Sequence, residues 1–171
     1  MKIICGGMWV ALIVAASNTW AAPVFMSEEW AAEACNAWNE NPKLVTGLAG
    51  KWIGNDAGRG YKVIHIYRSD CDTTRRVELT ITDSEGGAHC SYGGTVQHNA
   101  LNGDVDYLMY ANDQDWVCMG KGDWGCGPMG AMATGKLKFE GPKMEAMSVM
   151  GPFEDFLLLT GSLDSDRNSC P

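Results

Sequence analysis

The hydrophobic pattern changes its period near residue 60, from the repeat of a helix to the alternation of a β-strand. Before this point, the segment "SEEWAAEACNAWNENP" starts with a serine that can cap a helix, ends at Pro42, and places Trp30 and Trp38 on one face. After it, residues 61–68 form a predicted strand with apolar side chains on both faces, which suggests a central position, and residues 75–83 alternate apolar and polar side chains. The chain must therefore pack helices against a sheet, which predicts the α+β class.

The rest of the chain supplies further strands and helices. Turn residues at hairpin spacing bound two more predicted strands, 89–98 and 103–111. A short helix is expected over 113–122, followed by a fifth short strand within "GKLKFEG". Residues 142–161 predict a C-terminal helical segment with a break at Gly151–Pro152. We expect a single domain with a five-stranded, mostly antiparallel sheet that helices cover on one face.

The alternation in the second predicted strand indicates which of its side chains face the core. In "RRVELTITD", Val77, Leu79 and Ile81 are expected to point inward, and Glu78 and Thr80 outward with Thr82. We expect Trp30 and Trp38 of the first predicted helix to pack in the core rather than to clamp a ligand.

The first residues have the pattern of a secretory signal peptide. Lys2 precedes a short apolar run and the small-residue site "NTWAA", which predicts cleavage after Ala21. An uncleaved N-terminal anchor is the alternative. We expect residues 22–162 to form one domain and residues 163–171 a polar tail, in a protein of the periplasm or the secreted fraction.

Six cysteines lie beyond the predicted signal, and an even number in an exported chain is typical of disulfides. Cys118 and Cys126 flank a glycine-rich segment, so we expect them to pair with each other. The other pairings are not deducible. Zinc is disfavoured because no C-x-x-C pair occurs and the histidines are scattered.

Charge and motifs exclude several classes of function. The formal net charge is −8 with no basic stripe, which is unfavourable for binding nucleic acid, or anionic membranes by charge alone. His65, His89 and His98 are isolated in sequence, and no G-x-S-x-G motif occurs. We therefore predict no catalytic residues, no metal site, no cofactor and no enzymatic activity.

Three stretches together resemble the sterol-carrier-protein type 2 domain family, in its bacterial single-domain form. They are "FMSEEWAAEACNAWNENP", "VDYLMYANDQDWVCMGKG" and "GPMGAMATGKLKFEGPKMEAM". The chain differs from the mostly cytosolic or peroxisomal family in its export signal, its six cysteines and the longer link "KGDWGCGP". The resemblance implies an apolar tunnel between the sheet and the C-terminal helix, which holds a sterol, acyl chain, phospholipid or isoprenoid non-covalently.

The methionines leave three interpretations open for the proposed tunnel. Met144, Met147 and Met150 recur at every third position, and Met129 and Met132 share that spacing. They can line a lipid pocket, since methionine fits irregular apolar shapes, or belong to an ordinary core. Thioethers at this spacing can also bind copper(I), which makes periplasmic copper handling the first alternative function.

A second alternative is an accessory subunit that presents a lipid to a partner enzyme. Partners would be a hydrophobic small molecule, with transient membrane or protein contact as an option, and the oligomeric state is undetermined. The residues expected to line the pocket are Trp116, Val117, Met129, Met132, Leu137, Phe139, Met144, Met147, Phe153, Phe156 and Leu157.

Overall fold

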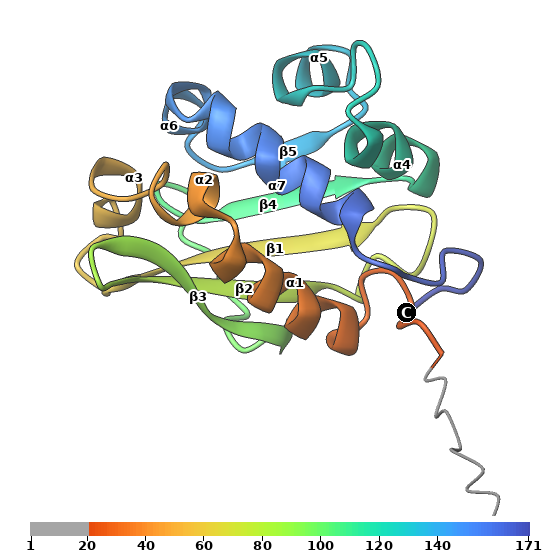
Figure 1. Ribbon diagram of the computed structural model, residues 1–171, viewed down its shortest axis with the longest axis horizontal. Coiled ribbons are helices and arrows are strands. Elements are labelled where there is room, and N and C mark those ends of the chain that lie inside the picture. Colours follow the sequence, from red (N-terminus) through yellow and green to blue (C-terminus); the bar gives the residue numbers. More distant parts are fainter. Residues whose placement is uncertain (1–20) are drawn as a thin grey trace, which may run out of the picture.

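The computed structural model describes residues 21–171, so the predicted signal peptide lies outside the described residues except for Ala21. The described chain folds into a sheet and a layer of helices (Figure 1). In chain order the elements are α1 (Glu28–Glu40), α2 (Pro42–Val45), α3 (Lys51–Gly54), β1 (Tyr61–Arg68), β2 (Val77–Ser84), β3 (Gly87–Thr95), β4 (Tyr107–Ala111), α4 (Asp113–Lys121), α5 (Pro128–Ala133), β5 (Lys138–Glu140), α6 (Lys143–Ser148) and α7 (Met150–Ser162).

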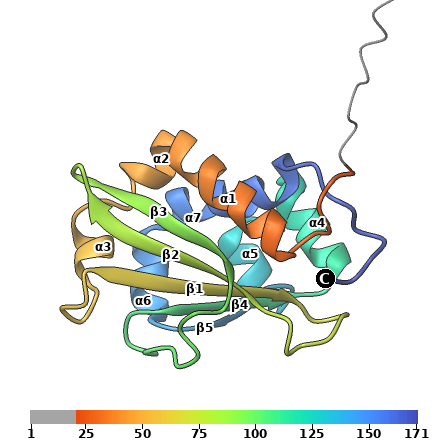
Figure 2. The ribbon, with the colours of Figure 1, turned by 90° about the horizontal axis from the view of Figure 1, so that it is seen from below.

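The sheet has five strands in the order β3-β2-β1-β4-β5, which confirms the predicted strand number. Every neighbouring pair is antiparallel except β1 and β4, which run parallel. The chain between β3 and β4 therefore crosses the sheet instead of making a hairpin. Figure 2 shows α1, α2 and α7 together on one side of this sheet, as expected for the α+β class.

Helix α1 is fixed at its start by a cap and along its length by the sheet. The Ser27 hydroxyl accepts a hydrogen bond from the Trp30 backbone N–H (3.3 Å), and the Trp38 indole N–H donates to the Ala88 carbonyl in β3 (2.8 Å). A disulfide joins Cys35 to Cys90 on the same strand. Gly93 is needed there because a Cβ at that position would lie 2.1 Å from the Ala31 carbonyl oxygen of α1.

The second face of the sheet is more covered than the sequence suggested. Glu78 and Thr80 were predicted to point outward to solvent, yet both are buried. The reason is the crossing segment between β3 and β4, since the backbone N–H groups of Gln97 and His98 donate to the Glu78 carboxylate (3.0 and 2.8 Å). Both side chains lie on the outer face, as predicted, and only the implied exposure of that face to solvent is wrong.

The break in the C-terminal helical segment lies at Val149, two residues earlier than predicted. Pro152 occupies the first turn of α7, where a backbone N–H has no helical partner, so proline is tolerated and the helix continues. The predicted break at Gly151–Pro152 is wrong in position, while the division into two helices is confirmed.

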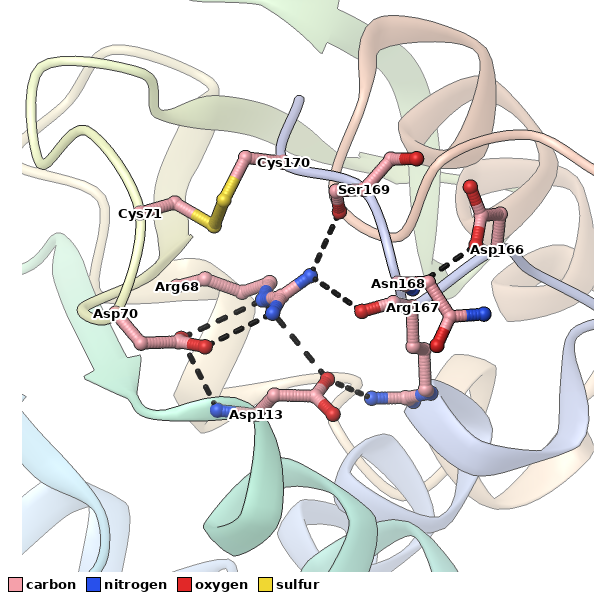
Figure 3. The surroundings of a disulfide bond; sticks show 9 residues. All are labelled: Arg68, Asp70, Cys71, Asp113, Asp166, Arg167, Asn168, Ser169 and Cys170. Carbon is pink, nitrogen blue, oxygen red and sulfur yellow. Dashed lines mark hydrogen bonds and ion pairs between the residues drawn. A yellow bond between two sulfur atoms is a disulfide. The ribbon is translucent and has the colours of Figure 1, made fainter.

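The polar tail is held by a network around Arg68 (Figure 3). The Arg68 guanidinium donates to the backbone carbonyls of Arg167 (3.1 Å) and Ser169 (2.9 Å) and to the Asp70 carboxylate (2.8 Å). A disulfide between Cys71 and Cys170 lies beside it. The last residues are thus fixed on the domain near the end of β1.

Candidate functional site

An open groove of about 500 Å³ lies along the edge strand β5. Figure 1 shows α5 and α6 at this edge of the molecule, near β5. The lining is mostly apolar, with charged side chains from β5 and α6 among it. The lining residues are Tyr110, Met129, Met132, Ala133, Gly135, Leu137, Lys138, Phe139, Glu140, Lys143, Met147 and Met150.

Local sequence explains how α5 forms one wall of the groove. Pro128 begins this helix, where its fixed φ suits the first helical position. Just before it, the predicted disulfide between Cys118 and Cys126 is present and ties α5 to α4. After the helix, Gly135 has a φ of 74°, the left-handed conformation that lets the chain turn from α5 toward β5.

The space beneath α7 is nearly filled, in contrast to the open tunnel that the resemblance implied. A cavity of about 10 Å³ lies there, lined by residues that include Trp38, Trp52, Tyr107, Phe153 and Phe156. Such a space holds at most one water molecule. Bulky aromatic side chains occupy the volume, so the open room for a ligand is at the edge of the sheet and not under the helix.

Among the predicted lining residues, the structure places Met129, Met132, Leu137, Phe139 and Met147 in the groove. They come from α5, from β5 and the residue before it, and from α6, which are separate in sequence. The methionines of α5 and α6 thus share one cavity, although the sequence spacing alone did not show this.

The remaining predicted lining residues lie elsewhere. Phe153 and Phe156 line the small inner cavity, and Leu157 belongs to the core. Trp116 is buried, with its indole N–H donating to the Tyr67 carbonyl (3.2 Å). These positions follow the apolar stripes of their helices, which face the core.

Two further predictions fall outside the groove for a different reason, the direction of the side chain. Met144 is 79% exposed, and Val117 on α4 is half-buried and does not line the groove. Conversely, Tyr110, Ala133, Gly135, Lys138, Glu140 and Lys143 line it but were not predicted. The signal for Lys138 and Glu140 was their position on either side of the predicted lining residue Phe139 in a short strand.

A buried polar network holds α6 against the sheet next to the groove. The Lys62 ammonium of β1 donates to the Glu145 carboxylate of α6 (2.5 Å) and lies 4.5 Å from the centre of the Trp52 ring. The Tyr107 hydroxyl donates to the same carboxylate (2.9 Å) and accepts from the Trp52 indole (2.8 Å). Burial lowers the pKa of Lys62, against the opposing effect of Glu145, and burial raises the pKa of Tyr107.

A second buried cluster centres on Glu78, on the other face of the sheet. Its carboxylate contacts His65 Nε2 (3.2 Å) and His98 Nδ1 (2.7 Å) and accepts from the Thr80 hydroxyl (2.8 Å). Burial opposes ionisation, but these hydrogen bonds and those from the Gln97 and His98 backbone outweigh it, and the pKa of Glu78 falls to about 2. Burial also lowers the pKa of His65.

The described part of the chain, residues 21–171, has no group of three or more histidine, cysteine, aspartate or glutamate side chains arranged to hold a metal ion. None of its helices combines the length and the apolar character needed to cross a bilayer.

Comparison with known proteins gives this arrangement a family. The model of the SCP-2 sterol transfer family matches residues 33–154, from α1 into α7. The chain belongs to the SCP-2 sterol transfer family. The resemblance seen in the sequence is therefore confirmed, and the match includes the groove, both of its walls and the network around Lys62.

One solved structure supports the SCP-2 assignment at the level of the fold, and two others are similar at lower TM-scores. A crystal structure of sterol carrier protein 2 has a TM-score of 0.54 and 14% identity, and the alignment covers 81% of this chain and 98% of that one. A conserved hypothetical protein from Thermus thermophilus, solved in solution, has a TM-score of 0.45 and 16% identity, covering 85% and 96% of the two chains. The UbiJ-SCP2 ubiquinone synthesis protein has a TM-score of 0.41 and 16% identity, covering 78% and 89%. No curated protein sequence matches this chain significantly.

Proposed function

We propose that this protein binds a lipid or another hydrophobic molecule in the groove along β5 and carries it outside the cytoplasm, without catalysis. The observation that carries the proposal is the methionine-rich groove of about 500 Å³ in a member of the SCP-2 sterol transfer family. This volume lies in the range of about 300–1,000 Å³ typical of small-molecule sites.

The mostly apolar lining of the groove suits a ligand that binds mainly through its hydrocarbon surface. Burial of about 300 Å² of hydrocarbon supplies about 7 kcal/mol at the usual coefficient, from which association costs are subtracted. Methionine side chains adapt to different shapes, so one groove can accept acyl, sterol or isoprenoid ligands. Lys138 and Lys143 also line the groove and suit a ligand with a carboxylate or phosphate head.

Transport outside the cytoplasm is supported by the cysteines. All six beyond the predicted signal are paired, as Cys35–Cys90, Cys71–Cys170 and Cys118–Cys126. Such bonds persist in oxidising compartments. Fractionation of the host cells tests this part of the proposal, which requires the protein in the periplasmic or secreted fraction.

The binding test compares two variants of neighbouring methionines on α6. Met147 lines the groove, whereas Met144 is exposed and does not. We expect Met147→Asp to weaken binding of a fluorescent fatty acid by about tenfold or more, because a charge then faces the apolar ligand. Met144→Asp is the matched control and should bind as the wild type does. Equal affinities of the two variants would place the ligand elsewhere.

Copper is the competing occupant of the same groove. A titration of the purified protein with copper(I) against a chelator distinguishes the two. Tight copper binding, together with failure to bind fatty acid and sterol probes, would replace the lipid proposal by a metal-handling one.

A further inference from the structure

A recess distinct from the groove lies on the face of the sheet that is turned away from the helices. Its volume is about 340 Å³, and its lining comes from β1, from the β1–β2 loop and from the segment that crosses from β3 to β4. The lining residues of this outer-face recess are His65, Thr73, Thr74, Arg76, Val96 and Asn99. None of them lines the groove along β5, so the proposed lipid site gives the recess no role.

His65 is the buried member of this lining, with 1% of its side chain exposed. Its Nε2 lies 3.2 Å from an oxygen of the Glu78 carboxylate, whose pKa of about 2 keeps it ionised at neutral pH. An ionised carboxylate only accepts hydrogen bonds, so the proton of this bond is on Nε2. Burial lowers the pKa of His65, so the ring is neutral and its Nδ1 is an acceptor.

This Nδ1 atom is buried and has no hydrogen-bond partner among the described residues. Buried polar atoms of folded proteins nearly all have a partner, so an unpartnered acceptor indicates a donor that comes from outside the chain. The ring of His65 lines the outer-face recess, and a molecule in the recess that has an O–H or N–H group can supply this hydrogen bond. The recess therefore favours a ligand with a donor.

Arg76 adds a positive charge to the same recess. Its guanidinium lies 5.5 Å from the centre of the Tyr67 ring on β1. Within residues 21–171, the ion pairs of arginine side chains involve Arg59, Arg68 and Arg167, but not Arg76. A guanidinium without a carboxylate partner is well suited to bind two oxygens of a carboxylate or a phosphate.

The acidic side chains near the recess leave this charge largely uncompensated. Asp72 accepts hydrogen bonds from the backbone N–H (3.0 Å) and the hydroxyl (2.8 Å) of Thr74, and Asp106 forms an ion pair with a different arginine (2.6 Å). Glu140 and Arg76 line a neighbouring hollow, but Glu140 is exposed, so solvent and salt screen its charge. Among the lining residues of the recess, Arg76 is thus the charged one.

We propose that the outer-face recess binds a small oxoanion that carries its own O–H, with Arg76 on the anionic oxygens and His65 Nδ1 accepting from the O–H. Hydroxycarboxylates and protonated phosphates have this combination of charge and donor. The volume lies in the range of about 300–1,000 Å³ typical of small-molecule sites. The proposal goes beyond lipid binding and is independent of the groove.

The test is an NMR titration of the protein with ¹⁵N-labelled histidine rings, at pH 7 in a buffer free of phosphate. Phosphate keeps a proton at this pH and sulfate does not, and glycolate has the hydroxyl that acetate lacks. We expect phosphate or glycolate to shift the His65 Nδ1 signal and to bind at least about tenfold more tightly than its partner without the O–H. The pair with the larger ratio identifies the class of ligand. The ring signals of His89, which does not line the recess, should stay in place.

Arg75 and Arg76 provide a matched pair of variants. Both are exposed neighbours in the chain, but only Arg76 lines the recess. We expect Arg76→Ala to weaken binding of the preferred anion by about tenfold and Arg75→Ala to bind it as the wild type does. Both variants should keep wild-type affinity for a fluorescent fatty acid, because neither arginine lines the groove.

Three results would overturn the proposal. An Nδ1 signal that none of the four anions moves would show that water alone is its partner. Equal affinities within both pairs of anions would show that no donor is recognised, and equal affinities of the two variants would remove Arg76 from the site. A wild-type protein that binds the anion but not the fatty acid would remove the lipid proposal and leave this site in place.

Discussion

Glu78 shows how one side chain can have opposite meanings in sequence and in structure. The alternation in β2 placed it on the face away from the helices, and that assignment is correct. The expectation that this face meets solvent was wrong, because the β3–β4 segment lies over it. The alternation of side chains along a strand predicts which residues share a face. It does not predict whether a segment distant in sequence will cover that face.

The burial of Glu78 gives acid sensitivity to the fold. Its pKa is about 2 in the folded protein and 4.5 in its ordinary state, so the ionised carboxylate stabilises the fold. This contribution, about 3 kcal/mol, is complete above pH 4.5 and disappears as the pH falls to about 2. Glu78→Gln should lower the free energy of unfolding at pH 7 by a similar amount and flatten its dependence on pH in that window.

Urea unfolding at a series of pH values checks this expectation. Glu40→Gln, at an exposed position on α1, is the control and should follow the wild type. A Glu78→Gln variant as stable as the wild type at pH 7, with the same acid dependence, would show that the cluster around Glu78 does not stabilise the fold.

Elements with a strong internal signal were predictable, and those fixed by neighbours were not. The Ser27 cap, the period of β1 and the glycine after α4 each located an element end or face. The short helices α2 and α3 have four residues each and no amphipathic repeat, so the sequence did not reveal them. The groove was also only partly predictable, because it needs α5, α6 and β5 to meet, while Trp116 and Leu157 share the apolar character of its lining.

The disulfide beside α5 is expected to shape the groove more than its short loop would suggest. Replacing Cys118 and Cys126 by alanine should cost about 2–3 kcal/mol of stability in the loop-entropy estimate and should weaken ligand binding, because α5 loses its tie to α4. The disulfide between Cys71 and Cys170 closes a loop with a sequence separation of 99 residues. Replacing both cysteines by alanine should therefore cost more stability, but it should leave the groove intact. Thermal unfolding and fluorescent fatty acid titration measure the two effects, and the reverse order of ligand affinities would contradict the assigned role of α5.

At the scale of the molecule, the fold divides its apolar volume into two unequal parts. Aromatic side chains fill the space between the sheet and α7, and the open volume lies outside, along β5. Helix α6 borders the groove, with Glu145 bonded to the buried Lys62 and with Met144 and Met147 exposed. The cysteines fix three places around this arrangement, at α1, at the tail and at α5. The domain thus has a nearly filled aromatic core and an accessible, mostly apolar groove at the edge of its sheet.

The most direct test of the ligand site is NMR of the protein labelled with ¹³C at the methionine methyl groups, titrated with a fatty acid. The account predicts that the signals of Met129, Met132, Met147 and Met150, which line the groove, move with the ligand. The signals of the buried Met26, Met109 and Met119 should stay in place. Large shifts of the core methionines with little change in those of the groove, or no shifts at all with acyl and sterol ligands, would contradict it.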